Sequence, residues 1–575
     1  MTESGSASNY SLSKWLFAVA VGLPTIGYLY YYYRKTSLKE DADNSRKPNK
    51  QKNADDEFIQ ENGGSNETSK VEGPLERALS LKNSGNDFYK QRMHSEAIRC
   101  YTEAIDLCPN EEKEYLATFY QNRAAAHEVL NNLEEVIKDC NEAIKLKSNY
   151  TKALTRRYKN HEKLGNLRQA LEDVTACCLL EQFGNADTLA AADRILKALG
   201  SAEAKKFQIN RKPVMPSKLF VKTYFNSFEH DPVLQSLRQL NGVAEGVPNE
   251  RGIDAAKFAL RDERYEDILG HCNEEITDTL NSESPTERYL EALLLRATIY
   301  SLTSQTELAL KDLDLIINSK PENIKLLVNA HLKRAYAYMH LEDPDKALDD
   351  FDMASSLDST NSDAAHQKAQ ILLMCEKLPE AIAEFERAVN LNPKFALSLV
   401  QKIYAEYRKA VMDRDVSKIN SAKSALKRAV AKNPTCSEGY MLLAQVYTDN
   451  QEYDEAESVF IQGTKSDPTN ATFLVHLGML YLQWKGDLEN AVKYMEKAIE
   501  IDPKCEFAYE TLGSVEAQRG NMLKSISLFD KALAFSKSEK EAAHILSLKA
   551  AAQAQHSVSA TLGLSWLFRS SNKKF

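Results

Sequence analysis

Five polar side chains in the N-terminal third of the chain have types and spacing that suit carboxylate binding. They are three cations and two amides, namely Lys82, Asn86, Asn122, Lys152 and Arg156. Lys82 and Asn86 are spaced i,i+4, so in a helix they share one face. The same spacing separates Lys152 from Arg156. Donors that converge from neighbouring helices suit a ligand with two close carboxylates, such as an acidic C-terminal residue together with its main-chain carboxylate.

The alternative is that the three cations are ordinary solvated residues, since Lys and Arg together make up 73 of the 575 residues. At that frequency, basic residues would occupy all three positions by chance in roughly 0.2% of cases, so we favour the binding site. We expect Arg156 to be an exposed cation that can grip a carboxylate through two donors. Because such a cation has no core packing to lose, its removal should hardly change stability.

Helices must position these residues, and an internal repeat of about 34 residues predicts such helices. In each copy, small residues lie where the two helices of a hairpin approach closely, and a Pro stops the second helix. The first copy is complete, with Gly85, Phe88, Ala97, Tyr101, Ala104 and Pro109. A later copy has Ala369, Ala381, Phe385, Ala388 and Pro393. This is the pattern of the tetratricopeptide repeat (TPR), which predicts an all-α fold.

With the weaker copies included, we expect a TPR superhelical solenoid of about eleven repeats in two blocks. The first block is an N-terminal TPR clamp domain over residues 74–184, which holds the first three repeats. A connector over residues 185–251 breaks the period. The second block is a C-terminal TPR domain over residues 252–556, which holds the remaining repeats. It ends in a capping helix from Glu539 to His556 that covers the last apolar face of the solenoid.

The beginning of the chain predicts one transmembrane helix followed by a flexible linker. After a short segment over residues 1–14, residues 15–33 (WLFAVAVGLPTIGYLYYYY) carry no charge, and as a helix they rise roughly 28 Å, enough to span a bilayer. Basic residues follow this run, which by the positive-inside rule places the long C-terminal part in the cytosol. Residues 34–73 are too polar to pack and should form a tether.

A cleaved signal peptide is the alternative to this membrane anchor. No small-residue cleavage site follows the apolar run, and the strong basic flank lies on the wrong side of it. We therefore favour the anchor. At the other end of the chain, residues 557–575 form a tail to which the sequence assigns no role.

Composition and motifs argue against catalysis, cofactors, metal sites and nucleic-acid binding. The formal net charge of -9 gives no overall attraction to nucleic acid. The nine cysteines are scattered without a Cys-x-x-Cys pair, which fits a reducing compartment. The sequence contains no Gly-rich phosphate loop, HExxH motif or Gly-x-Ser-x-Gly elbow, and the repeats leave no room for a catalytic domain. We expect a protein that binds other proteins and is not an enzyme.

The first helices of the second block offer a less charged face, which suits extended or helical apolar segments of other proteins. The candidate residues are Tyr336, Gln367, Tyr404, Leu442, Gln445, His476, Met479 and Phe507. The alternative is that several of these side chains simply pack between helices. For each single residue the sequence leaves both interpretations open.

The segments LKNSGNDFYK, FYQNRAAAH and YTKALTRR resemble the dicarboxylate clamp of chaperone-binding TPR domains. This resemblance implies that the five clamp residues hold the C-terminal Glu-Glu-Val-Asp of cytosolic heat-shock chaperones of the seventy- and ninety-kilodalton classes. With the anchor, the two blocks and phrases such as KALTRRYKNHEKLG and FAYETLGSVEAQRGNM, most of the chain resembles one family. It is the family of large TPR import receptors (seventy-kilodalton class) of the mitochondrial outer membrane translocase, in its animal form.

Membership of that family implies a single-pass receptor of the mitochondrial outer membrane whose C-terminal domain faces the cytosol. The implied partners are the chaperones, mitochondrial preproteins including inner-membrane carriers, other subunits of the translocase, and the lipid bilayer through residues 15–33. A second assignment stays open: a membrane-anchored TPR co-chaperone or scaffold on another organelle, such as the endoplasmic reticulum, would use the same clamp. The tail does not match the ending expected of the family.

Overall fold

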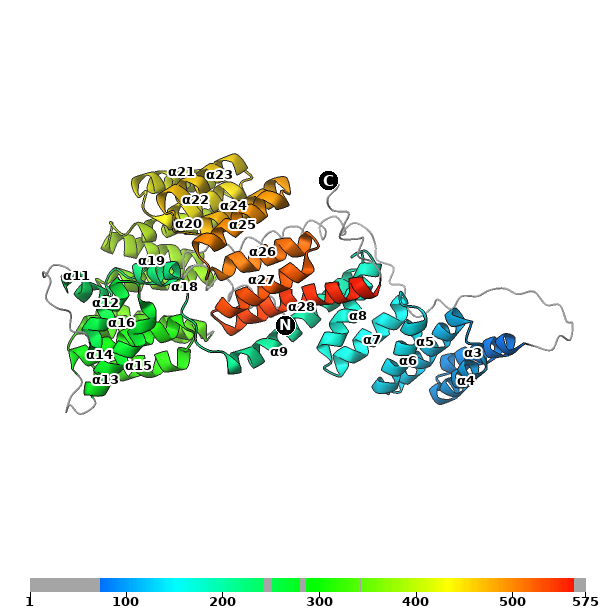
Figure 1. Ribbon diagram of the computed structural model, residues 1–575. Coiled ribbons are helices and arrows are strands. Elements are labelled where there is room, and N and C mark those ends of the chain that lie inside the picture. The colour runs from blue at the N-terminus through cyan, green and yellow to red at the C-terminus, as the bar shows by residue number, and fades with distance from the viewer. Residues whose placement is uncertain (1–72, 241–250, 280–285, 342, 563–575) are drawn as a thin grey trace. The chain divides into compact units, whose positions relative to one another are not determined.

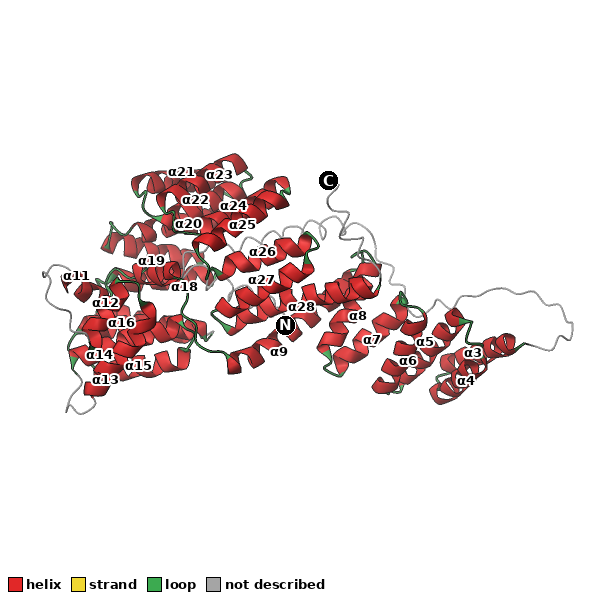
Figure 2. Cartoon of the chain, in the orientation of Figure 1, coloured by secondary structure: helices red, strands yellow, loops and turns green. Residues whose placement is uncertain are grey.

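The computed structural model describes residues 73–240, 251–279, 286–341 and 343–562. In these ranges every regular element is a helix (Figure 1, Figure 2). The predicted segment 1–14, the predicted anchor 15–33 and nearly all of the predicted linker lie outside the described residues. Among the helices that the structure does describe, none combines the length and the apolar character needed to cross a bilayer.

The helices pair into antiparallel hairpins along the chain, as the repeat predicts. The first three hairpins are α3 (Pro74–Lys90) with α4 (His94–Leu107), α5 (Lys113–Val129) with α6 (Leu133–Leu146), and α7 (Thr151–Lys163) with α8 (Leu167–Leu180). Three helices then interrupt the series: α9 (Ala186–Asn210), α10 (Lys218–Asn226) and α11 (Pro232–Leu240).

Hairpins resume after this interruption and continue to the end of the described chain. The first of them are α12 (Gly252–Arg261) with the 3-10 turn η1 (Tyr265–Asp267) and α13 (Ile268–Thr279), α14 (Glu287–Leu302) with α15 (Thr306–Ser319), and α16 (Ile324–His340) with α17 (Pro344–Leu357). The middle ones are α18 (Ser362–Met374) with α19 (Leu378–Leu391), and α20 (Ala396–Met412) with α21 (Val416–Lys432). The last are α22 (Ser437–Asp449) with α23 (Tyr453–Ser466), α24 (Thr472–Lys485) with α25 (Leu488–Ile501), and α26 (Glu506–Gln518) with α27 (Met522–Phe535), followed by α28 (Glu539–Thr561).

The small residues of the repeat lie where the two helices of a hairpin touch. A Cβ atom on Gly85 in α3 would lie 2.7 Å from Cε1 of Tyr101 in α4. Gly513 in α26 has the same relation to Phe529 in α27, at 2.8 Å. Because carbon atoms do not approach that closely, only glycine lets the aromatic ring pack against the backbone of the first helix.

An arginine on the first helix of several hairpins holds the second helix through an ion pair. Arg123 with Asp139, Arg157 with Asp173, Arg296 with Asp312 and Arg334 with Asp350 repeat this contact at one sequence spacing. In each pair the Nε and Nη2 groups donate to the two carboxylate oxygens. Such bidentate pairs fix the orientation of both side chains, so they join the helices of a repeat in one geometry.

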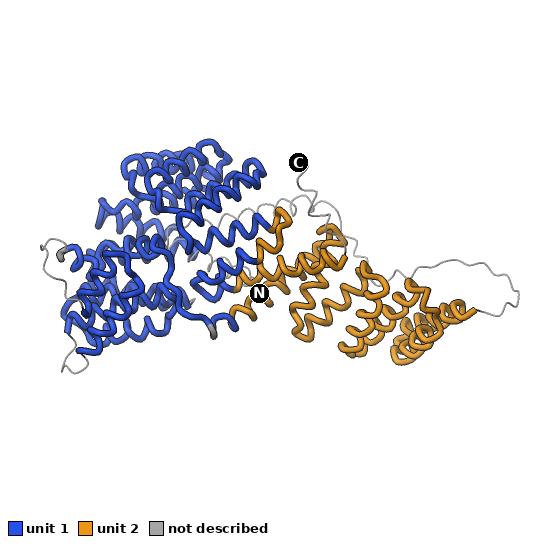
Figure 3. Tube along the Cα trace, in the orientation of Figure 1, with its two compact units in different colours: residues 1–34, 206–516, 527–542 blue, residues 35–205, 517–526, 543–575 orange. Residues whose placement is uncertain are grey.

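The described residues fall into two compact units, each assembled from separate stretches of sequence (Figure 3). One unit contains, of the described residues, 73–205, 517–526 and 543–562. The other contains residues 206–516 and 527–542. The predicted domains are continuous in sequence, whereas these units are not; the predicted domain boundaries stay a prediction.

The C-terminal half of α28 explains the split composition of the first unit. Its Ala550, Ala554 and Val558 lie in one apolar cluster with Leu171 of α8 and Ile195 of α9. Because Val558 is buried there, the helix continues to Thr561, past the predicted end at His556. This part of the predicted capping helix therefore covers the end of the N-terminal hairpins.

The later part of the connector, which contains α10 and α11, is packed into the second unit. Phe220, Val221 and Tyr224 of α10 belong to the core cluster of the hairpins from α12 to α18. Just before α11, Asp231 pairs with the buried ammonium of Lys333 in α16 at 3.0 Å. This later part of the connector thus belongs to the core of the second unit.

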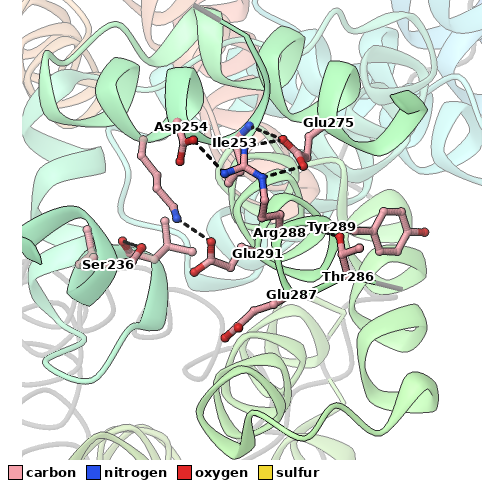
Figure 4. A network of polar contacts seen from close by, with 12 residues as sticks. Ser236, Ile253, Asp254, Glu275, Thr286, Glu287, Arg288, Tyr289 and Glu291 are labelled. Carbon is pink, nitrogen blue, oxygen red and sulfur yellow. Dashed lines mark hydrogen bonds and ion pairs between the residues drawn. The ribbon is translucent and has the colours of Figure 1, made fainter. Parts of the chain in front are cut away.

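A polar network joins α12, α13 and α14 in this unit, as Figure 4 shows. Arg288 of α14 pairs with Asp254 of α12 at 2.8 Å and with Glu275 of α13 at 3.0 Å. Lys257 of α12 pairs with Glu291 of α14 at 2.5 Å. Glu275 also accepts a hydrogen bond from the backbone N–H of Ile253, in the first turn of α12. These contacts fix α12 where the series of hairpins resumes.

Candidate functional site

The structure places the five predicted clamp residues on the first helices of the first three hairpins. Lys82 and Asn86 lie on α3, Asn122 on α5, and Lys152 and Arg156 on α7. First helices of successive TPR hairpins line one face of the solenoid. All five side chains therefore lie on helices that can present them to one ligand.

The two amides contact each other directly. The Nδ2 group of Asn122 donates to Oδ1 of Asn86 at 3.2 Å, and the hydroxyl of Tyr101 donates to the same oxygen at 2.8 Å. The Asn86 oxygen is therefore saturated, and its Nδ2 group finds no acceptor elsewhere in the described chain. This arrangement orients the amide of Asn86 as a hydrogen-bond donor, which is what a carboxylate requires.

The two lysines differ from the arginine in their surroundings. Lys152 is exposed and Lys82 is half-buried. Neither ammonium has an ion-pair partner in the part of the chain that the structure describes. An incoming anion can therefore pair with either ammonium without breaking an ion pair within the protein.

Arg156 is not the exposed, unpaired cation that the sequence led us to expect. Its side chain is 20% exposed, and its Nε donates to Oε2 of Glu128 in α5 at 2.7 Å. Its Nη1 lies 3.4 Å from the backbone oxygen of Gln121. The expectation of an exposed cation is therefore wrong. Because the substitution would leave the half-buried Glu128 without its cation, we now expect removal of Arg156 to lower stability.

Glu128 and Asn160 also contribute to the surroundings of Arg156, although no sequence pattern indicated them. Asn160, fully buried on α7, donates to Oε1 of Glu128 at 2.9 Å and to the backbone oxygen of Arg156 at 2.8 Å. Burial opposes ionisation of Glu128, but its hydrogen bonds to Arg156 and Asn160 and the charge of Arg156 hold its pKa below the ordinary value. A Glu in the last turn of a helix is usually solvated, so no motif or spacing indicated this contact.

The eight predicted preprotein-binding residues are mostly buried. Tyr336 and Met479 are half-buried. The residues that are less than a tenth exposed are Gln367, Tyr404, Leu442, Gln445, His476 and Phe507. Tyr404, Leu442 and Phe507 share one apolar cluster on α20, α22 and α26. Packing between helices therefore accounts for much of their apolar surface.

The connector contacts two of these eight residues. The ring of Tyr224 in α10 lies edge-on to Tyr336 with the ring centroids 5.4 Å apart. The Nε2 group of Gln367 donates to the backbone oxygen of Ser227 at 3.2 Å. Further along, the backbone N–H of His230 donates to Asp363 at 2.7 Å. The connector thus lies against the first helices α16 and α18.

Farther along the same series, polar groups cross from one first helix to the next. The Nε2 group of Gln370 in α18 donates to Oε1 of Gln401 in α20 at 3.0 Å. Gln401 in turn hydrogen-bonds Glu438 of α22. Burial raises the pKa of Glu438 to about 7, against the hydrogen bond from Gln401. Burial likewise lowers the pKa of His476 in α24 to about 3, so this ring is neutral at pH 7.

Comparison with known proteins identifies the repeat and places the whole chain among relatives. Two models of the tetratricopeptide repeat match, over residues 415–474 and 471–505. Mitochondrial import receptor subunit TOM70 of Homo sapiens is 40% identical over 96% of this chain and 93% of its own length. The protein of the same name from Rattus norvegicus is also 40% identical over the same shares.

A solved structure supports the fold. The crystal structure of yeast Tom70 superposes with a TM-score of 0.52 and 20% sequence identity, and the match covers 86% of this chain and 99% of that one. At that identity the likeness concerns the fold alone. The predicted all-α TPR architecture is confirmed by this match together with the repeat models.

Proposed function

Because this chain belongs to the family of the mitochondrial import receptor subunit TOM70, we propose that it docks cytosolic chaperones at the clamp of α3, α5 and α7 and passes preproteins into mitochondria. It is an import receptor of the mitochondrial outer membrane and not an enzyme. The observation that carries the docking proposal is the direct hydrogen bond between Asn86 of α3 and Asn122 of α5, together with the restrained Arg156 of α7. It supports a site of prearranged donors on three successive first helices.

The clamp suits the end of an acidic peptide. Two carboxylates, one from the main-chain terminus and one from an Asp side chain, can pair with the unpaired ammonium groups of Lys82 and Lys152 and with the amide donors of Asn86 and Asn122. Arg156 adds a charged donor. Each hydrogen bond to a charged group contributes about 1.5 to 3 kcal/mol, so losing one should weaken binding roughly 10- to 100-fold. The ligand we propose is the C-terminal Glu-Glu-Val-Asp of heat-shock chaperones of the seventy- and ninety-kilodalton classes.

Preproteins, including inner-membrane carriers, are the proposed cargo of the second series of hairpins. The connector covers Tyr336 and Gln367, so we place the cargo surface on α20 to α26. There Met479 is half-buried, and Tyr404, Leu442, Gln445, His476 and Phe507 lie on first helices. Substituting Met479 with Ser should weaken binding of a carrier precursor while leaving binding of the chaperone tail unchanged. Equal binding of the precursor by this variant would exclude Met479 from the surface.

Residues 15–33 are the proposed single-pass anchor, with the described helices in the cytosol. Other subunits of the outer-membrane translocase would then be its neighbours in the membrane. Protease added to intact mitochondria should release a fragment that contains the hairpins. Protection of that fragment until the outer membrane is ruptured would contradict this topology. A fluorescent fusion of residues 1–40 that labels the endoplasmic reticulum instead would favour the co-chaperone or scaffold on another organelle.

The docking proposal is tested with the full chain in detergent and a peptide that ends in Glu-Glu-Val-Asp. Calorimetric titration should show binding that weakens as salt is added, because exposed charges are screened. The same peptide with an amidated C-terminus should bind at least roughly tenfold more weakly, because one carboxylate is lost. Equal affinity for both peptides would overturn the two-carboxylate clamp.

A further inference from the structure

We propose that Glu128 is a positioning residue of the carboxylate clamp: it holds the Nε edge of Arg156 and leaves the far end of the guanidinium for the ligand. The inference rests on the proposed docking function and names a residue that tunes the same site. Glu128 itself touches no ligand in this account. It acts through Arg156.

The arginines that pair with an Asp within a hairpin differ from Arg156, because all three of their guanidinium nitrogens donate to the protein. In Arg123 the Nε and Nη2 groups donate to Asp139, and Nη1 donates to Thr102. In Arg157 the Nε and Nη2 groups likewise donate to Asp173, and Nη1 donates to Asn141. In a side chain held like this, every nitrogen already donates to the protein, so neither terminal nitrogen is wholly free for a peptide.

Arg156 is held differently. Its Nε makes a single hydrogen bond to Glu128 at 2.7 Å, and Nη1 makes a long contact of 3.4 Å with the backbone oxygen of Gln121. Nη2 has no acceptor among the residues that the structure describes. The pair of terminal nitrogens can therefore take a carboxylate in the bidentate geometry that arginine favours, while the bond from Nε to Glu128 stays in place.

Glu128 is itself fixed, which is what a positioning group requires. One carboxylate oxygen accepts from Arg156 and the other accepts from Asn160, which is fully buried. Asn160 also donates to the backbone oxygen of Arg156. The chain of contacts runs from the backbone of α7 through Asn160 and Glu128 back to the side chain of Arg156, so the guanidinium is restrained before any ligand arrives.

The alternative is that Glu128 competes with the ligand for the charge of Arg156 and so weakens binding. A competing carboxylate would take both donors of one edge, as Asp139 does with Arg123. Glu128 takes only Nε. The geometry therefore favours positioning over competition, and the two effects predict affinity changes of opposite sign.

A matched control exists one repeat further along. Glu162 stands at the equivalent position of α7 and pairs with Arg194, which donates through Nε at 2.7 Å and Nη2 at 2.9 Å. Neither residue belongs to the clamp. Substituting Glu162 with Ala therefore breaks a comparable ion pair in the same unit without touching Arg156.

The experiment titrates the full chain in detergent with the peptide that ends in Glu-Glu-Val-Asp. Glu128→Ala should weaken binding roughly tenfold, Glu128→Gln, which keeps an acceptor oxygen, should restore part of the loss, and Glu162→Ala should bind as wild type. In an Arg156→Ala background, Glu128→Ala should have no further effect, because Glu128 acts through Arg156. A purely structural role would not give this coupling.

The outcomes separate this inference from the docking function. If wild type and Arg156→Ala behave as the clamp requires but Glu128→Ala binds as tightly as wild type, or more tightly, the positioning role is overturned and the clamp stands. The positioning role is also overturned if the effects of Glu128→Ala and Arg156→Ala simply add. Equal binding of free and amidated peptide by wild type would instead overturn the clamp itself.

Discussion

Arg156 and Arg157 are neighbours in sequence, but their contacts give them different roles. Arg156 keeps donors for a ligand, whereas Arg157 pairs with Asp173 and Asn141 through all three nitrogens. Asp173 is 4% exposed, and burial raises its pKa despite the opposing contribution of Arg157. The repeat pattern alone does not tell which arginine of the pair serves the site.

Arg157→Ala should destabilise the N-terminal hairpins by about 3 to 5 kcal/mol, because it leaves a buried carboxylate without its partner. Chemical denaturation of the full chain in detergent, followed by the fluorescence of a label on α7, measures this loss. Peptide binding by the fraction that remains folded should be close to that of wild type. An unchanged denaturation midpoint would show that the ion pair between Arg157 and Asp173 contributes little.

Glu438 predicts a pH dependence in the second unit. Burial raises its pKa to about 7, above the ordinary value of 4.5 for a glutamate, so the folded state binds the proton more tightly than the unfolded state does. Its contribution to stability is therefore fully present below about pH 4.5 and is lost as pH rises through about 7. Glu438→Gln removes the ionisation, so the variant should gain stability relative to wild type between pH 5 and 8. If the denaturation midpoints of Glu438→Gln and wild type differ by the same amount at every pH in this range, the raised pKa is contradicted.

At the scale of single elements, the close contact between α3 and α4 also supports the clamp. The Tyr101 ring packs on Gly85, and its hydroxyl donates to Asn86. A Cβ at position 85 would push the ring away, so Gly85→Ala should destabilise the hairpin by about 1 to 3 kcal/mol and weaken peptide binding as well. Gly270→Ala is the control, since nothing lies within 4 Å of its Cβ position in α13. Equal melting temperatures of Gly85→Ala and wild type would count against this packing.

The connector gives a second test at this scale. The ammonium of Lys333 lies 4.7 Å from the ring centroid of Phe228 and 5.2 Å from that of Tyr224, and Asp231 is its ion-pair partner. Asp231→Asn keeps an oxygen that can cap α11 but removes the negative charge. Because Lys333 then stays buried without its partner, the free energy of unfolding should fall by about 3 to 5 kcal/mol.

Adding Lys333→Met to Asp231→Asn should recover most of that stability, because a buried ion pair replaced by apolar groups of similar volume is often neutral. Calorimetric unfolding of wild type, the single variant and the double variant measures both steps. If the double variant is less stable than Asp231→Asn alone, the aromatic surroundings of Lys333 do not accept an apolar side chain.

Over the whole molecule, local patterns were predictable and long-range contacts were not. The spacing of Gly85, Tyr101 and their counterparts recurs along the sequence, so the TPR fold and the helices that carry Lys82, Asn122 and Arg156 could be predicted. The contacts of Glu128 with Arg156, of Tyr224 with Tyr336 and of Ala550 with the N-terminal hairpins join residues far apart in sequence. No periodicity encodes such pairs, because each depends on how complete helices pack.

The central claim is that Arg156 grips a carboxylate at the end of a chaperone tail, and a double-mutant cycle across protein and peptide tests it most directly. Wild type and Arg156→Ala in the full chain are each titrated with the peptide ending in Glu-Glu-Val-Asp, with its amidated form, and with a form whose last Asp is Asn. The account predicts that Arg156→Ala weakens the free peptide roughly 10- to 100-fold. It also predicts that altering the peptide, by amidation or by changing its last Asp to Asn, reduces affinity much less for Arg156→Ala than for wild type. This should hold for at least one of the two alterations. If both altered peptides lose as much with Arg156→Ala as with wild type, Arg156 does not contact either carboxylate and the account is wrong.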